Sequence, residues 1–166
     1  MTVAGIDLAV KKPTAIAVLE ECQLLYLGLA DTDEEIVYTT SLFKPSVVAI
    51  DAPLTLPEEG KWVRDVEVEL RSLGYRLLPP LLGPMKSLTE RGIRISRMFS
   101  AEVIEIHPAT SLKAMGLTRE DLRRKFGVRH RDLIDAIAAA LTATAYKLGH
   151  YKRYGPFVLP NARVCI

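Results

Sequence analysis

Short apolar runs separated by polar turns dominate the first third of the chain. They predict strands at residues 2–8, 14–19 and 23–30. Lys11, Lys12 and Pro13 indicate a turn, so we expect the first two strands to form a β-hairpin. Another continuous apolar run at 47–50, with a proline on either side, is typical of a central strand covered on both faces.

Helical and strand patterns alternate in the rest of the chain. Helices are predicted at 31–43 and 61–74, and another carries Arg91, Arg94 and Arg97 on its polar side. An ordered loop is expected at 77–83, and His107 and Pro108 end a buried strand at 101–106. A short basic helix at 118–126 and a long alanine-rich helix at 132–148 follow, and the tail from 155 onward suits one more strand.

This element order predicts an α/β fold, with a mixed sheet and helices on both faces. The length of 166 residues suits a single domain, and 49% hydrophobic with 25% charged residues describes an ordinary globular interior. We expect a soluble, cytoplasmic protein, since no apolar stretch is long enough to span a bilayer and the N-terminus lacks signal-peptide features. Cys22 and Cys165 lie far apart in sequence and predict two unlinked residues rather than a disulfide framework. The near absence of side-chain amides favours a thermophilic source.

Charge is divided unevenly along the chain. Residues 20–67 hold eleven acidic and three basic residues, whereas residues 71–131 hold thirteen basic and five acidic ones. A basic surface beside an acidic cleft suits a metal-dependent enzyme acting on a polyanion, because Lys and Arg bind phosphates while carboxylates bind the cation. Two solvated helix faces would give the same pattern.

Carboxylates stand at the ends of three predicted strands: Asp7, Asp51 and Glu105. If these strands are parallel, their carboxyl ends meet at one edge of the sheet, where functional groups of α/β proteins gather. Asp132 and Asp135 lie three residues apart, on one face of the first turn of the last helix. Asp132 also suits a helix N-cap and Asp135 a first-turn acid that the helix dipole favours.

A site made of these oxygen ligands alone would select Mg²⁺ or Mn²⁺ over zinc. Two such ions about 4 Å apart activate water and stabilise the leaving oxygen in phosphodiester cleavage. The residues therefore predict hydrolytic chemistry.

Several motifs resemble those of a family of predicted nucleases with a ribonuclease-H-like fold. They are Gly5-Ile6-Asp7, Ala49-Ile50-Asp51-Ala52-Pro53-Leu54, Val103-Ile104-Glu105-Ile106-His107-Pro108 and Asp132-x-x-Asp135-Ala136. The middle region, from Arg64-Asp65 to Arg91-Gly92, is also similar, so the resemblance covers nearly the whole chain. The first and last motifs further resemble Holliday-junction resolvases of the RuvC type.

The resemblance implies a five-stranded sheet in the order 3-2-1-4-5 with strand 2 antiparallel, in a single domain with an insertion around residues 55–100. It implies a metal site built from Asp7, Asp51 and Asp135, with Asp132 or Glu105 as a fourth carboxylate, and nucleic acid as the partner. A homodimer is left open. The side chains expected to contact substrate are Lys11, Lys12, Arg64, Arg71, Arg91, Arg94, His107 and His130.

Some of these residues also have ordinary structural interpretations. Lys11 and Lys12 suit a solvated turn, both histidines suit structural hydrogen bonds, and Arg64 could pair with Asp65. The leading hypothesis is a metal-dependent nuclease. The alternatives are a non-catalytic nucleic-acid-binding or scaffold protein and an actin-like phosphotransferase, and the latter would need glycine-rich phosphate loops that are not evident here.

Overall fold

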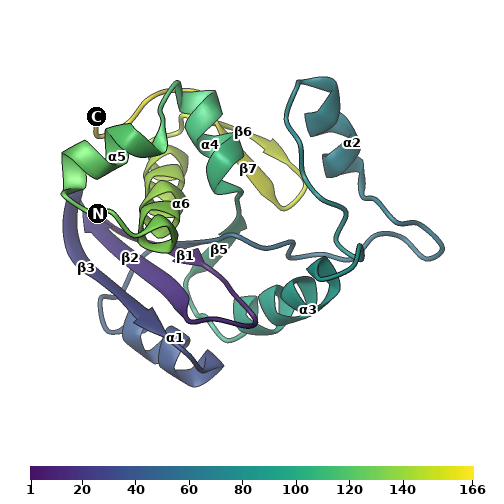
Figure 1. Ribbon diagram of the computed structural model, residues 1–166, viewed down its shortest axis with the longest axis horizontal. Coiled ribbons are helices and arrows are strands. Elements are labelled where there is room, and N and C mark those ends of the chain that lie inside the picture. Colours follow the sequence, from purple (N-terminus) through teal and green to yellow (C-terminus); the bar gives the residue numbers. More distant parts are fainter.

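One sheet organises the whole chain in the computed structural model, which describes residues 1–166 (Figure 1). Its strand order is β3-β2-β1-β4-β5-β7-β6. The strands are β1 (Thr2–Asp7), β2 (Thr14–Glu20), β3 (Gln23–Ala30), β4 (Val47–Ile50), β5 (Glu102–Glu105), β6 (Tyr151–Tyr154) and β7 (Phe157–Pro160). The predicted order 3-2-1-4-5 is confirmed, with β2 antiparallel to both neighbours and β1, β4 and β5 parallel.

The sheet has seven strands rather than the five expected. The hairpin of β6 and β7 extends it beyond β5, and the single pair Glu105–Phe157 joins β7 to β5. Only β7 corresponds to the strand predicted after residue 155. Strand β6 was not predicted because it contains no apolar run: its two central residues, Lys152 and Arg153, are exposed on the sheet edge.

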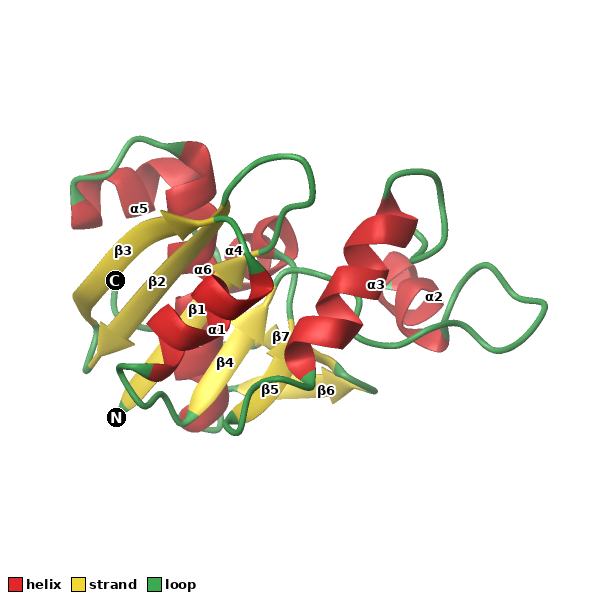
Figure 2. Ribbon diagram, turned by 90° about the horizontal axis from the view of Figure 1, so that it is seen from below, coloured by secondary structure: helices red, strands yellow, loops and turns green.

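Helices cover both faces of the sheet, as predicted (Figure 2). They are α1 (Asp33–Ser41), α2 (Asp65–Ser72), α3 (Met85–Ser96), α4 (Pro108–Met115), α5 (Arg119–Phe126) and α6 (Arg131–Lys147). Ile36 of α1 and Ile95 of α3 pack with Ile6 and Ile50 in one core, while α4, α5 and α6 pack on the opposite face. No helix is long and apolar enough to cross a bilayer.

Helix α4 was not expected from the sequence. Pro108 ends β5, as predicted, but it is also the first residue of the new helix, where the missing N–H of proline costs nothing. The helix ends at Gly116, whose φ of 68° is the left-handed conformation of a C-cap.

The two cysteines form a disulfide, so the expectation of unlinked cysteines is wrong. After β7 the tail crosses α4, where Arg163 donates to the carbonyl oxygens of Met115 and Gly116. It then brings Cys165 to Cys22 in the turn between β2 and β3. A separation of 143 residues hides this pairing, because only the folded sheet brings the tail back to that turn.

Candidate active site

Asp7 and Asp51 stand side by side at the carboxyl ends of the neighbouring strands β1 and β4. The parallel ladder pairs Ile6 with Ile50, and the backbone N–H of Asp51 continues it by donating to the Ile6 oxygen at 2.9 Å. Side chains alternate between the faces of a strand, so Asp7 shares a face with Gly5 and Asp51 with Ala49. That face is covered by α6.

Helix α6 packs unusually close to β1 because both surfaces carry small residues. A Cβ added to Gly5 would lie 2.2 Å from the backbone oxygen of Ala136, so only glycine admits the helix at this distance. Alanines continue the contact surface along α6, which brings the first turn of the helix over Asp7. The close approach explains how a short Asp side chain on α6 reaches the strand ends.

The carboxyl groups of Asp7 and Asp51 lie close enough for each to shift the pKa of the other. The pKa of Asp7 is raised to about 7, chiefly by burial. The interaction with Asp51 opposes this rise, and the charges of Asp135 and Asp132 add to it. Burial and the charge of Asp7 also raise the pKa of Asp51 well above its usual range. Ionising both carboxyl groups would place two like charges side by side in a buried site, which is electrostatically unfavourable. Without a cation, the pair therefore retains a proton at neutral pH.

The two α6 acids each contact a basic side chain. Asp135, whose side chain is 12% exposed, accepts from Nε of Arg119 at 2.8 Å and from a second guanidinium nitrogen at 3.4 Å. Asp132 accepts from Nζ of Lys12 at 2.9 Å, and this bond raises the pKa of Lys12. The N-cap of α6 is His130, so the cap interpretation of Asp132 is wrong. Asp132 is the acid of the first turn, and Asp135 lies just beyond that turn rather than in it as expected.

Glu105 does not join these acids. It pairs in register with Ile50, so it faces the side of the sheet opposite to Asp7 and Asp51. Both of its oxygens accept from Arg64, at 2.8 and 2.7 Å, and Oε1 also accepts from the backbone N–H of Leu54 at 2.9 Å. Arg64 binds Glu67 as well, at 2.6 Å, and all three residues are buried. Arg64 therefore pairs with Glu67, three residues along the chain, and with the distant Glu105 rather than with Asp65.

As the side chains lie, no group of three or more His, Cys, Asp or Glu residues is arranged to hold a metal ion. Asp135 faces Arg119 and Asp132 faces Lys12, which leaves Asp7 and Asp51 as a pair. The donor chemistry nevertheless fits a hard divalent cation. The donors are all carboxylates, and a buried like-charged pair that must otherwise hold a proton needs positive charge.

Comparisons with known proteins bear on the fold. No protein-family model matches the chain, and no curated protein matches it in sequence. Two solved structures from Thermus thermophilus are similar over 96% of this chain and 99% of theirs. They are RuvC in complex with a Holliday-junction substrate (17% identity, TM-score 0.59) and RuvC alone (16% identity, TM-score 0.56). The chain has a ribonuclease-H-like fold.

Within the ribonuclease-H-like fold, two arginines predicted to contact substrate join α3 to α1. Arg91 and Arg94 donate to Asp33 at 2.8 and 2.7 Å, and Arg91 also binds the carbonyl oxygens of Ala9 and Asp31. Burial opposes ionisation of Asp33, but the hydrogen bonds from Arg94 and Arg91 outweigh it and lower its pKa. Arg91 is therefore occupied inside the protein, whereas Arg94 is paired through Nε alone and its side chain stays 58% exposed.

Other predicted contacts remain exposed. Lys11 lies on the hairpin turn, Arg71 on α2 and His130 at the start of α6. His107 is half-buried, with Nδ1 2.7 Å from Oγ1 of Thr110, and burial lowers its pKa. Together with Asp51, Arg64 and Glu105, His107 lines a cavity of about 180 Å³.

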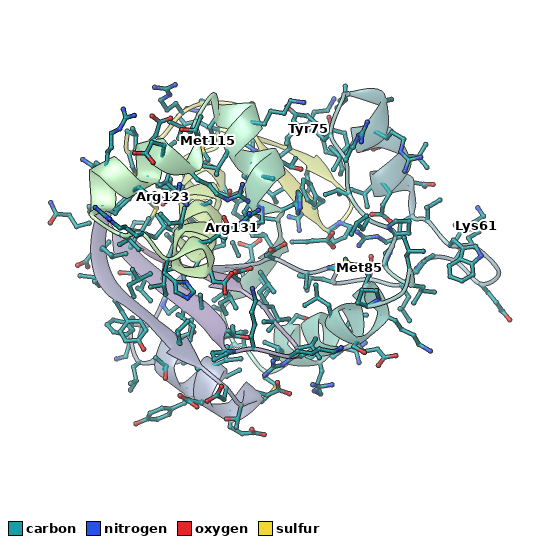
Figure 3. All side chains as sticks on the ribbon, viewed as in Figure 1. Lys61, Tyr75, Met85, Met115, Arg123 and Arg131 are labelled. Carbon is teal, nitrogen blue, oxygen red and sulfur yellow. A yellow bond between two sulfur atoms is a disulfide. The ribbon has the colours of Figure 1, made fainter.

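The exposed basic surface lies beside the α6 acids. Arg124, Lys125, Arg129 and Arg131 are exposed on α5 and the start of α6. Figure 3 shows Arg123 and Arg131 on this side of the molecule, far from Lys61 on the protruding loop before α2. The sequence prediction named none of these basic residues as a substrate contact. It named only their neighbour His130, and it also missed Arg119. The charge count placed them in a basic half of the chain, but only the packing of α5 against α6 shows which of them flank the acids.

Proposed function

We propose that this protein is a metal-dependent nuclease that hydrolyses phosphodiester bonds in nucleic acid. The observation that carries the proposal is the pair of Asp7 and Asp51, which converge from adjacent parallel strands with no basic side chain bonded to either. A protein gains nothing in stability from such a pair, and unfavourable arrangements of buried charge concentrate at functional sites. The ribonuclease-H-like fold supports the proposal, since the similar RuvC is described in complex with a Holliday junction.

Asp7, Asp51 and Asp135 would hold the divalent cation, with Asp132 as a further ligand. Bound there, Mg²⁺ or Mn²⁺ would supply an activated water and neutralise charge on the scissile phosphate. Glu105 has a different role in this proposal, because Arg64 already binds both of its oxygens. It holds the loop after Asp51 through the backbone N–H of Leu54 and so keeps the strand end in place.

Basic side chains around α5 and the start of α6 would bind the nucleic-acid backbone beside the acids. His107 lies on the same side and has a lowered pKa, so it is neutral at physiological pH and able to accept a proton from a water molecule.

The test is cleavage of branched, hybrid and single-stranded substrates with Mg²⁺ or Mn²⁺. We expect Asp7→Asn and Asp51→Asn each to lower the rate at least about a hundredfold, because each removes a ligand charge from the site. Glu90→Gln is the matched control: it removes an exposed carboxylate of α3 that forms no ion pair, and should leave the rate unchanged. Cleavage that persists in both Asp variants would reject the proposal.

One observation favours a non-catalytic nucleic-acid-binding protein as a second candidate. Asp132, Asp135 and Glu105 are each already paired with a basic residue. Salt-dependent binding of nucleic acid in EDTA, without cleavage under any metal condition, would support this alternative.

A further inference from the structure

Arg119 is the basic residue that binds Asp135, one of the proposed cation ligands. It is the first residue of α5, and it contacts Asp135 through two nitrogens of the guanidinium. The planar fork of Arg suits a carboxylate better than the single ammonium of Lys12 does on Asp132. Asp135 is also the more enclosed of the two α6 acids, with its side chain 12% exposed against 18% for Asp132.

This contact has a direct consequence for any cation that needs Asp135. The guanidinium lies 2.8 Å from Oδ1 and 3.4 Å from Oδ2 of Asp135, so it engages both carboxylate oxygens and repels a second positive charge nearby. The charge of Asp135 also raises the pKa of Asp7, so Asp135 is electrostatically coupled to the strand-end pair. Arg119 should therefore weaken cation binding while it stays on Asp135.

Arg119 is also placed to leave Asp135. Its side chain is 26% exposed, and α5 continues into the basic surface of Arg124, Lys125 and Arg129. A nucleic-acid backbone bound to that surface would offer the guanidinium a phosphate, which it binds in the same forked geometry as a carboxylate.

We infer that Arg119 is a positioning residue that competes with the divalent cation for Asp135 until a backbone phosphate of the nucleic acid takes its guanidinium. The inference rests on the proposed function and adds its regulation: cation and nucleic acid bind cooperatively, each raising the affinity for the other by the same factor. The protein alone then binds the metal weakly, and the complete site forms only on a polyanion.

The test measures Mn²⁺ affinity by isothermal titration calorimetry, independently of cleavage. Without nucleic acid, we expect Arg119→Gln to bind Mn²⁺ about tenfold more tightly than the wild type, a coupling of ordinary size. Arg119→Lys keeps the positive charge and should stay within about threefold of the wild type. Arg76→Gln is the matched control, since it removes an exposed positive charge that forms no ion pair and lies outside the basic surface of α5 and α6. It should change the affinity less than twofold, a bound set by screening at an exposed site.

The second arm repeats the titration with a DNA duplex whose phosphorothioate linkages resist hydrolysis. We expect the duplex to raise the Mn²⁺ affinity of the wild type about tenfold and that of Arg119→Gln much less. Thermal unfolding of each variant confirms that it is folded.

Each outcome separates this inference from the proposed function. Equal Mn²⁺ affinity of the wild type and Arg119→Gln, or a duplex that leaves wild-type affinity unchanged, would overturn the inference while the nuclease proposal stands. Absence of Mn²⁺ binding in every variant would reject the proposed function as well.

Discussion

Asp51 and Glu105 stand at the ends of neighbouring parallel strands, yet only Glu105 has a basic side chain as its partner. Glu105 receives two hydrogen bonds from Arg64 and one from the backbone of Leu54. Asp51 has no basic partner, and its carboxyl is held against that of Asp7. The cause is a one-residue offset: Asp51 lies one position beyond the register pair of Glu105, so the two side chains leave opposite faces of the sheet.

The difference shows that this fold pairs one buried acid with a buried arginine and leaves two others without a basic partner. On the face of α2, Arg64 with Glu67 and Glu105 makes a buried network that fixes a loop. On the face of α6, negative charge is left uncompensated at Asp7 and Asp51. Stability measurements on the two faces should therefore respond with opposite signs.

Arg64→Ala should give the largest effect. It leaves Glu67 and Glu105 buried without their cation, and removing one partner of a buried ion pair costs about 3–5 kcal/mol. Urea unfolding measures the loss. Arg71→Ala, at an exposed position on the same helix, should change the free energy of unfolding by less than about 0.5 kcal/mol. A loss below about 1 kcal/mol for Arg64→Ala would mean that water molecules replace the hydrogen bonds of Arg64 to the two glutamates.

Asp7→Asn should stabilise the metal-free protein at alkaline pH. The carboxyl has its ordinary pKa of 3.8 in the unfolded chain, and burial raises the pKa to about 7 in the folded protein. The folded state therefore binds the proton more tightly, and the contribution of Asp7 to the free energy of unfolding falls as pH rises from about 4 to about 7. The Asn side chain does not titrate, so the variant does not lose stability over this pH range. Its free energy of unfolding should exceed that of the wild type by up to about 4 kcal/mol at pH 8 and by little at pH 4.

Urea unfolding in EDTA at both pH values measures this gain. Glu69→Gln, an exposed acid of α2, serves as the control and should show no such pH dependence. Equal stability of Asp7→Asn and the wild type at pH 8 would mean that another group already neutralises the pair.

Glu105→Gln should have the smallest effect. The amide oxygen can still accept from Leu54, and Arg64 keeps Glu67, so we expect a loss of about 1–2 kcal/mol. Mn²⁺ affinity should be unchanged, in contrast to Asp51→Asn. A drop of tenfold or more would place Glu105 among the metal ligands after all.

The sequence patterns predicted the sheet from β1 to β5 well because these strands are short, apolar and separated by turns. Asp7 and Asp51 were predicted to meet, and they do, since parallel strands end at one edge. Glu105 could not be separated from them without the register between β4 and β5. The basic partners of the acids could not be predicted from the sequence either, because Arg119 lies 16 residues from Asp135 and Arg64 lies 41 residues from Glu105. Such pairs depend on tertiary packing, which a local pattern does not encode.

The disulfide between Cys22 and Cys165 bears on how any of these experiments is run. It sits by the turn that follows β2, at the opposite end of β1 from Asp7, and it closes nearly the entire polypeptide into a covalent ring. Cross-links of this kind commonly contribute about 2–5 kcal/mol. Thiol reductants, which are routine additives in nuclease buffers, would open that ring. A loss of nuclease activity in such a buffer would then report a loosened scaffold, with the carboxylates at the strand ends still chemically intact.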